Sequence, residues 1–157
     1  MDGTGIAEAY STFAVTLRAG GFARPDTGWD ASLIAAHIAA NNDLIASTAE
    51  DIAAGQRPSY DNAEVIDDEQ LRQIAAAAGS LDAMAELIET SAARLARAWE
   101  LLGPELGSVE VPAKIADGGH VVRDGPIPIR SFIEGNATFH LQLHLDQLRS
   151  LQVSDPA

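Results

Sequence analysis

The sequence predicts an all-α protein, an up-down four-helix bundle that carries a β-hairpin or extended flap between its third and fourth helices. Three observations support this fold class. Alanine is frequent and only 5% of the residues are aromatic, a composition that favours helices. Apolar side chains recur at steps of three and four along four segments, as on one face of a helix. Between residues 103 and 128 this pattern changes to the alternation that is typical of strands.

The first two helices are expected in the first third of the chain. The first spans about residues 6–17 and ends at the glycine pair 20–21. The second begins after Asp30, because a carboxylate at that position can accept a hydrogen bond from an unpaired amide of the first turn. Its apolar face includes His37 and Asn41, two polar residues that need hydrogen-bonding partners inside the fold.

The third helix is expected to be the longest. Its apolar pattern spans about residues 68–102, with Gly79 in the middle, where we expect a bend. Gly103 and Pro104 then end the helical pattern.

A hairpin and the last helix are expected in the remainder of the chain. β-branched residues lie on both sides of an Asp-Gly-Gly turn at residues 117–119, which predicts the hairpin. The last helix begins after Pro128, and its apolar face carries His140 and His144.

Size and charge narrow the classes of function. A chain of 157 residues has the size of one domain, which we expect to span residues 1–157. The net charge of −13 disfavours binding to nucleic acid or to anionic membranes. The N-terminus lacks the basic segment of a signal peptide, and no apolar run approaches the roughly 18 residues of a membrane span, so we expect a cytoplasmic protein. The chain has no cysteine, so any metal ligands must be His, Asp or Glu.

Three histidines on apolar helix faces indicate a metal site. His140 and His144 lie one helical turn apart, a spacing that allows both rings to bind one divalent ion. His37, on the second helix, can supply the third ligand from across the bundle. Three imidazoles leave a fourth position open, and zinc, followed by nickel, suits such nitrogen ligands. A cluster of hydrogen-bonded core histidines remains the alternative, and His120, at the hairpin tip, is expected to be exposed.

Asn41 is a candidate substrate-binding residue. It follows His37 by one turn on the same face, from where its amide can bond to a substrate or to a metal ligand. A buried Asn that fixes the register of two helices is an equally good interpretation.

The histidine segments resemble those of a known superfamily. WDASLIAAH, which ends at His37, and HLQLHLDQL, which begins at His140, are similar to segments of the DinB-like superfamily, which includes the N-terminal domain of mycothiol-dependent maleylpyruvate isomerases. The resemblance implies a four-helix bundle with a divalent metal at His37, His140 and His144. It also implies mycothiol or bacillithiol as a thiol cosubstrate, and a homodimer.

The resemblance does not extend to the isomerase reaction itself. Those isomerases place a carboxylate where His140 stands, and they carry a further C-terminal domain that these 157 residues do not include. We therefore expect a different reaction of the same general type.

Three functions are compatible with the sequence. The first is a metal-dependent enzyme that transfers or isomerises through a low-molecular-weight thiol, acting on a small electrophile held between the helix ends and the flap at residues 109–130. The second is a non-catalytic bundle that binds or senses a ligand, because neither Glu134 nor Asp146 shares the histidine face as a general base. The third is a hydrolase that uses metal-bound water. No residue is assigned a catalytic role.

A homodimer is also expected from an apolar group late in the third helix and at the start of the flap. This group contains Trp99, Leu101, Leu102, Val109 and Val111. The alternative is that these residues close one end of the bundle.

Overall fold

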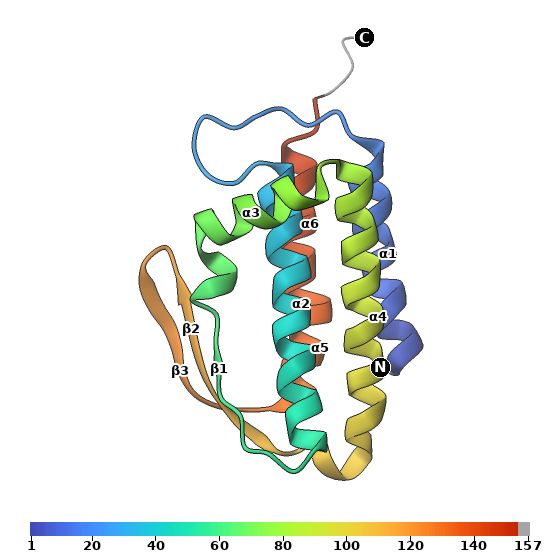
Figure 1. Cartoon of the computed structure of the whole chain (residues 1–157), viewed down its shortest axis with the longest axis vertical. Coiled ribbons are helices and arrows are strands. Elements are labelled where there is room, and N and C mark those ends of the chain that lie inside the picture. Colours follow the sequence, from blue (N-terminus) through green and yellow to red (C-terminus); the bar gives the residue numbers. More distant parts are fainter. Residues whose placement is uncertain (154–157) are drawn as a thin grey trace.

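The computed structural model describes residues 1–153 and is mostly helical, with a small three-stranded sheet along one side (Figure 1). The helices are α1 (Gly3–Ala19), α2 (Ala31–Ala53), α3 (Asp68–Ala78), α4 (Leu81–Leu106), α5 (Ile129–Gly135) and α6 (Leu141–Ser150). A 3₁₀ turn (Glu64–Ile66) precedes α3, and a π-turn (Asn136–His140) joins α5 to α6. The strands are β1 (Tyr60–Asp61), β2 (Glu110–Asp117) and β3 (His120–Pro128).

The long helices do not alternate in direction along the chain. α1 runs antiparallel to α4, whereas α2 and α4 run in the same direction (Figure 1). The contacts that fix these directions are Gly3 with Glu100 and Arg18 with Glu89 for the first pair, and Asn42 with Ser91 and Glu50 with Arg94 for the second. The alternating up-down order expected from the sequence is therefore wrong, because residues 54–80 carry the chain back along the molecule before α4 begins.

The third expected helix is two helices in the structure. α3 ends at Ala78, and Gly79 follows in the left-handed conformation with a φ of 80°. The Ser80 side chain then accepts a hydrogen bond from the amide of Ala83 and begins α4. A left-handed glycine ends one helix and a capping serine begins the next, so the bend expected at Gly79 is a break between two helices.

The N-cap predicted at Asp30 is confirmed by its bond to the amide of Leu33.

The predicted hairpin is confirmed, and it belongs to a larger sheet. β2 and β3 pair antiparallel up to Asp117 and His120, and the glycines between them have φ values of 55° and 82°. Positive φ at both positions of a two-residue turn is the conformation that glycine permits. Strand β1 pairs parallel to β2, with Tyr60 opposite Ala113. The all-α expectation is therefore incomplete, because the flap is part of a three-stranded sheet.

The apolar group expected to mediate a dimer lies mostly in the core. Trp99, Leu102 and Val111 are 3%, 2% and 1% exposed, whereas Leu101 and Val109 are 61% and 37% exposed. The three buried side chains pack with the helix faces that form the core, so these five residues do not make a surface patch.

Within residues 1–153, no helix is long and apolar enough to cross a membrane.

Candidate metal centre

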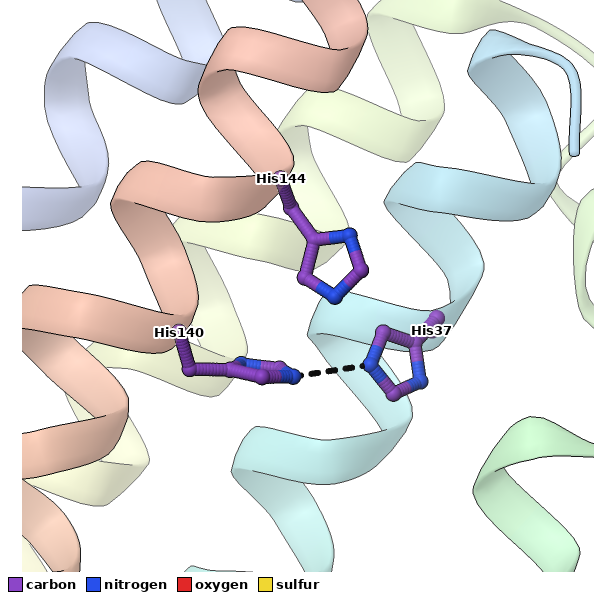
Figure 2. A group of neighbouring side chains, drawn as sticks. All are labelled: His37, His140 and His144. Carbon is purple, nitrogen blue, oxygen red and sulfur yellow. Dashed lines mark hydrogen bonds between the residues drawn. The ribbon is translucent and has the colours of Figure 1, made fainter. Parts of the chain in front are cut away.

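The three predicted histidines come together between α2 and the last helical segment. His37 projects from α2, His140 ends the π-turn, and His144 lies in the first turn of α6. One ring nitrogen from each lies within 4.8 Å of the others. Figure 2 shows the rings turned toward a common space, with a nitrogen of His144 directed toward the gap between His37 and His140.

Hydrogen bonds hold the rings and set which nitrogen carries the proton. The Nδ1–H of His37 donates to the carbonyl of Val65 at 2.6 Å, and the Nδ1–H of His144 donates to Oε1 of Gln147 at 2.9 Å. Both Nε2 atoms then present a lone pair in the neutral ring. Metal-binding histidines are usually oriented in this way, through a partner on the other ring nitrogen.

His140 completes the cluster in a different manner. Its Nε2 lies 3.0 Å from Nε2 of His37, the contact drawn in Figure 2, and it must donate because the His37 atom is unprotonated. In the described part of the chain, Nδ1 of His140 is buried without a hydrogen-bond partner. Moving the proton to Nδ1 would free Nε2 as a third ligand.

The site keeps its imidazoles neutral. Burial lowers the pKa of His37 from its ordinary 6.5 to about 4, although the Val65 carbonyl opposes the shift. Burial, reinforced by the two neighbouring rings, lowers the pKa of His140 to about 3. Burial also lowers the pKa of His144. All three rings are thus uncharged at neutral pH, and the uncharged imidazole is the form that binds a metal.

The spacing of the nitrogens fits a tetrahedral ion with a small adjustment. Two imidazole nitrogens bound to one zinc at about 2.05 Å lie roughly 3.3 Å apart. The nitrogens of His37 and His140 are 3.0 Å apart, close to this value. No pair of ligand nitrogens in the cluster is more than 4.8 Å apart, so side-chain shifts of about 1.5 Å or less bring the three nitrogens to the spacing of a zinc site. Neutral nitrogen donors of this kind suit zinc, nickel and copper.

Trp29 forms one wall of the site. Its ring lies 5.0 Å from the ring of His37 and 6.2 Å from that of His144, measured between centroids. Its Nε1–H donates to Oδ1 of Asp68 at 2.8 Å, which ties the indole to α3. The sequence pointed to Trp29 only through the motif that precedes His37, and nothing in the pattern indicated its contact with Asp68.

Asn41 lies beside the cluster, but its amide is bonded within the protein. The hydroxyl of Tyr60 donates to its Oδ1, and its Nδ2 donates to Oδ1 of Asn136 at 2.8 Å. Burial raises the pKa of Tyr60, so the hydroxyl keeps the proton that it donates.

His120 is exposed on β3 and lies outside the three-histidine group, as expected.

Two cavities adjoin the histidines, and the hairpin contributes to both. The smaller, about 310 Å³, is lined by His37, Asn41, Tyr60, Arg123 and His140 among others. The larger, about 570 Å³, is lined by Trp29, Asp68, Asp117, His144 and Gln147 among others. The two aspartates are carboxylates that the sequence did not associate with the site, because they come from α3 and the hairpin tip. A ligand can therefore approach the cluster along two paths.

One comparison with known proteins places the chain in a family. The family model for the mycothiol maleylpyruvate isomerase N-terminal domain matches residues 8–124. The chain belongs to this family. The resemblance to the DinB-like proteins is thereby confirmed. The match to the isomerase N-terminal domain includes Trp29 and His37 but ends before His140 and His144, so the structure alone places that pair beside His37. Searches of curated proteins and of solved structures gave no match.

Gly135 offers a test of the smaller cavity and of the helix beside it. Its backbone is helical, with φ −61° and ψ −38°, and a Cβ built there meets no atom within 4 Å. Gly135→Ala should therefore stabilise the protein by about 0.5–1 kcal/mol and raise the melting temperature by about 1–4 °C. Gly55→Ala is the matched control, because Gly55 also has open space but a φ of 82°, and it should lower the melting temperature. A lower melting temperature for Gly135→Ala would contradict the open cavity wall.

Proposed function

We propose that this protein is a divalent-metal-dependent enzyme that uses a low-molecular-weight thiol, mycothiol or bacillithiol, to transfer or isomerise a small electrophilic substrate. The observation that carries the proposal is the group of three neutral imidazoles within 4.8 Å of one another. Structural zinc sites are usually closed by four protein ligands, so three ligands favour an open, reactive site. The family supports the thiol part of the proposal.

His37, His140 and His144 would hold the metal through ring nitrogens, with zinc the first candidate and nickel the second. A divalent ion at this position supplies a Lewis acid that favours the deprotonated form of a thiol or a water bound to it. Val65 and Gln147 orient two of the rings through their Nδ1–H groups.

The surroundings support a reaction between two small molecules. Two cavities of about 310 and 570 Å³ reach different members of the cluster, so the thiol and the electrophile can occupy separate spaces. The ring of Trp29 covers one side of His37 and His144 and gives the site an apolar wall. Asn41 stays our candidate for substrate binding, and that role requires its amide to exchange a bond to Tyr60 or Asn136 for one to the substrate.

An activity screen tests this function. The protein is loaded with zinc or nickel and mixed with electrophilic substrates in the presence of mycothiol, bacillithiol or no thiol. We expect consumption of an electrophile that needs both the metal and one of the thiols. Turnover that persists without thiol would contradict the proposal and favour the hydrolase.

A non-catalytic ligand-binding or sensing module is the second candidate. It is favoured by the composition of the metal group, which contains histidines and no carboxylate within residues 1–153. Asp68 and Asp117, which line the larger cavity, offer acceptors that weaken this argument. Calorimetry that finds tight ligand binding by metal-stripped protein, together with no turnover in the screen, would select the second candidate.

A homodimer is a proposal that rests on the family resemblance, and a cytoplasmic location is a proposal that rests on the N-terminal sequence, which has no basic segment. The patch expected to support the dimer is mostly buried, so a dimer would need another surface. Light scattering of the purified protein gives the mass in solution, and a monomer at all concentrations would contradict it.

A further inference from the structure

A pair of buried amides repeats the geometry of the histidine pair one helical turn away. α2 and the last helical segment run antiparallel, so a step of four along one is matched by a step of four back along the other. His37 faces His140, with 3.0 Å between their Nε2 atoms, and Asn41 faces Asn136, with 2.8 Å from Nδ2 to Oδ1. If the last helical segment slides along α2, the contacts of the histidine pair and of the asparagine pair therefore change together.

The last helical segment changes its winding between these two pairs. Over Asn136–His140 the helix forms a π-turn, in which the amide of Leu141 donates to the carbonyl of Asn136, five residues back. A π-turn inserts one residue into an α-helix. Such insertions are rare in proteins, and those that occur are often found at functional sites. The hydroxyl of Thr138 donates to the carbonyl of Glu134 at 2.7 Å, a bond that competes with the regular ladder. Phe139 is 85% exposed, so packing of its ring does not hold the turn.

The side chain of Asn136 anchors the start of this turn to two other helices. Its Nδ2 donates to the hydroxyl of Tyr10 on α1 at 2.8 Å and to Oδ1 of Asn42 on α2 at 3.0 Å. Its Oδ1 accepts the bond from Asn41. The side chain is buried, with 5% exposed, so each of these bonds is made away from water and its loss leaves a buried group unpaired.

We infer that Asn136 is the positioning residue of the histidine cluster: it holds the π-turn, and the π-turn sets the direction of His140 relative to His37 and His144. Without the inserted residue, the helix on one side of the turn rotates by about 100° against the other. That rotation carries His140 away from His37 or carries Asn136 out of its buried network. The inference rests on the proposed metal site for its effect on metal binding, but the positions of the rings can be tested without metal.

The experiment compares three variants in metal-free and metal-loaded form. Asn136→Ala removes the anchor, Asn136→Asp keeps its shape and one acceptor, and Ser91→Ala is the matched control. Ser91 accepts a bond from Asn42 in the same buried network, but it lies on α4, a helix that carries none of the three histidines. Zinc affinity is measured by competition with a chelator, and the visible spectrum of the Co²⁺-loaded protein reports the ligand arrangement.

We expect Asn136→Ala to bind zinc at least about 10-fold more weakly and to change the Co²⁺ spectrum, as found when groups that orient metal ligands are removed. Asn136→Asp should recover part of the zinc affinity and part of the wild-type Co²⁺ spectrum. Ser91→Ala should match the wild type in both measurements. Equal affinity and spectrum for Asn136→Ala and wild type would overturn the inference, as would an equal loss in Ser91→Ala. If Asn136→Ala does not fold, Asn136→Asp decides the question through the same spectrum.

A metal-free measurement separates this inference from the proposed function. The ¹⁵N NMR shifts of the histidine rings report which nitrogens are protonated and hydrogen-bonded. We expect the contact between His37 and His140 in the wild type and in Ser91→Ala, and its loss in Asn136→Ala. Wild-type protein that binds no zinc but shows this contrast would refute the metal enzyme and leave the positioning role standing. The same ring shifts in all variants would overturn the positioning role whatever the zinc result.

Discussion

His37→Ala is expected to weaken zinc binding by more than about 100-fold. Removal of a residue that only orients a metal ligand costs 10–100-fold in affinity, so loss of the ligand itself costs more. His140→Ala and His144→Ala should have effects of the same size, because each leaves two of the three imidazoles. The affinities are measured by competition with a chelator of known strength.

His120→Ala is the matched control for these variants. It removes the fourth histidine of the chain, which is exposed on β3 and stands outside the cluster. Its zinc affinity should equal that of the wild type. A similar loss in all four variants would mean that zinc binds histidines nonspecifically, and wild-type affinity in the three cluster variants would place the metal elsewhere.

Acidification from pH 6.5 toward pH 5 is expected to destabilise the metal-free protein. The pKa values of His37 and His140 are lowered to about 4 and about 3 in the folded protein, whereas an unfolded chain protonates histidine near 6.5. Between these values the unfolded state binds more protons, so the free energy of unfolding falls as the pH falls. Each histidine that stays neutral in the fold contributes about 1.4 kcal/mol per pH unit.

Urea unfolding of the wild type and of His140→Gln between pH 6.5 and 5 tests this expectation. Glutamine does not titrate, so the variant should lose stability less steeply, with a difference in slope that rises toward about 1.4 kcal/mol per pH unit as the pH falls to 5. The contribution is absent above the unfolded pKa and grows as the pH drops below it. Parallel curves for the two proteins would show that His140 protonates in the fold as readily as in the unfolded chain.

Several features of the fold and site could be predicted because each depends on a local signal. Asp30 precedes an apolar helix face and caps it, and two glycines between strands form a turn with positive φ. His37, His140 and His144 were predicted together because each interrupts an apolar face, and a polar residue there needs a partner.

Other features of the structure could not be predicted, because no pattern in the sequence indicates them. β1 is a pair of residues, Tyr60 and Asp61, too short to show alternation, so its pairing with β2 was missed. The π-turn was hidden because the apolar pattern continues through it, although one residue is inserted. For Trp99 and Leu102 the sequence left a dimer surface and the end of the bundle as alternatives, because apolar side chains of a core and of an interface look alike in sequence. The structure buries both side chains.

X-ray absorption spectroscopy of the zinc-loaded protein tests most directly whether His37, His140 and His144 hold one ion. We expect one zinc per chain with three imidazole nitrogens at about 2.0–2.1 Å, and loss of this signal in the triple His→Ala variant. A zinc ion surrounded by oxygen ligands without imidazole scattering, or the same spectrum in the triple variant, would contradict the metal centre described for these three residues.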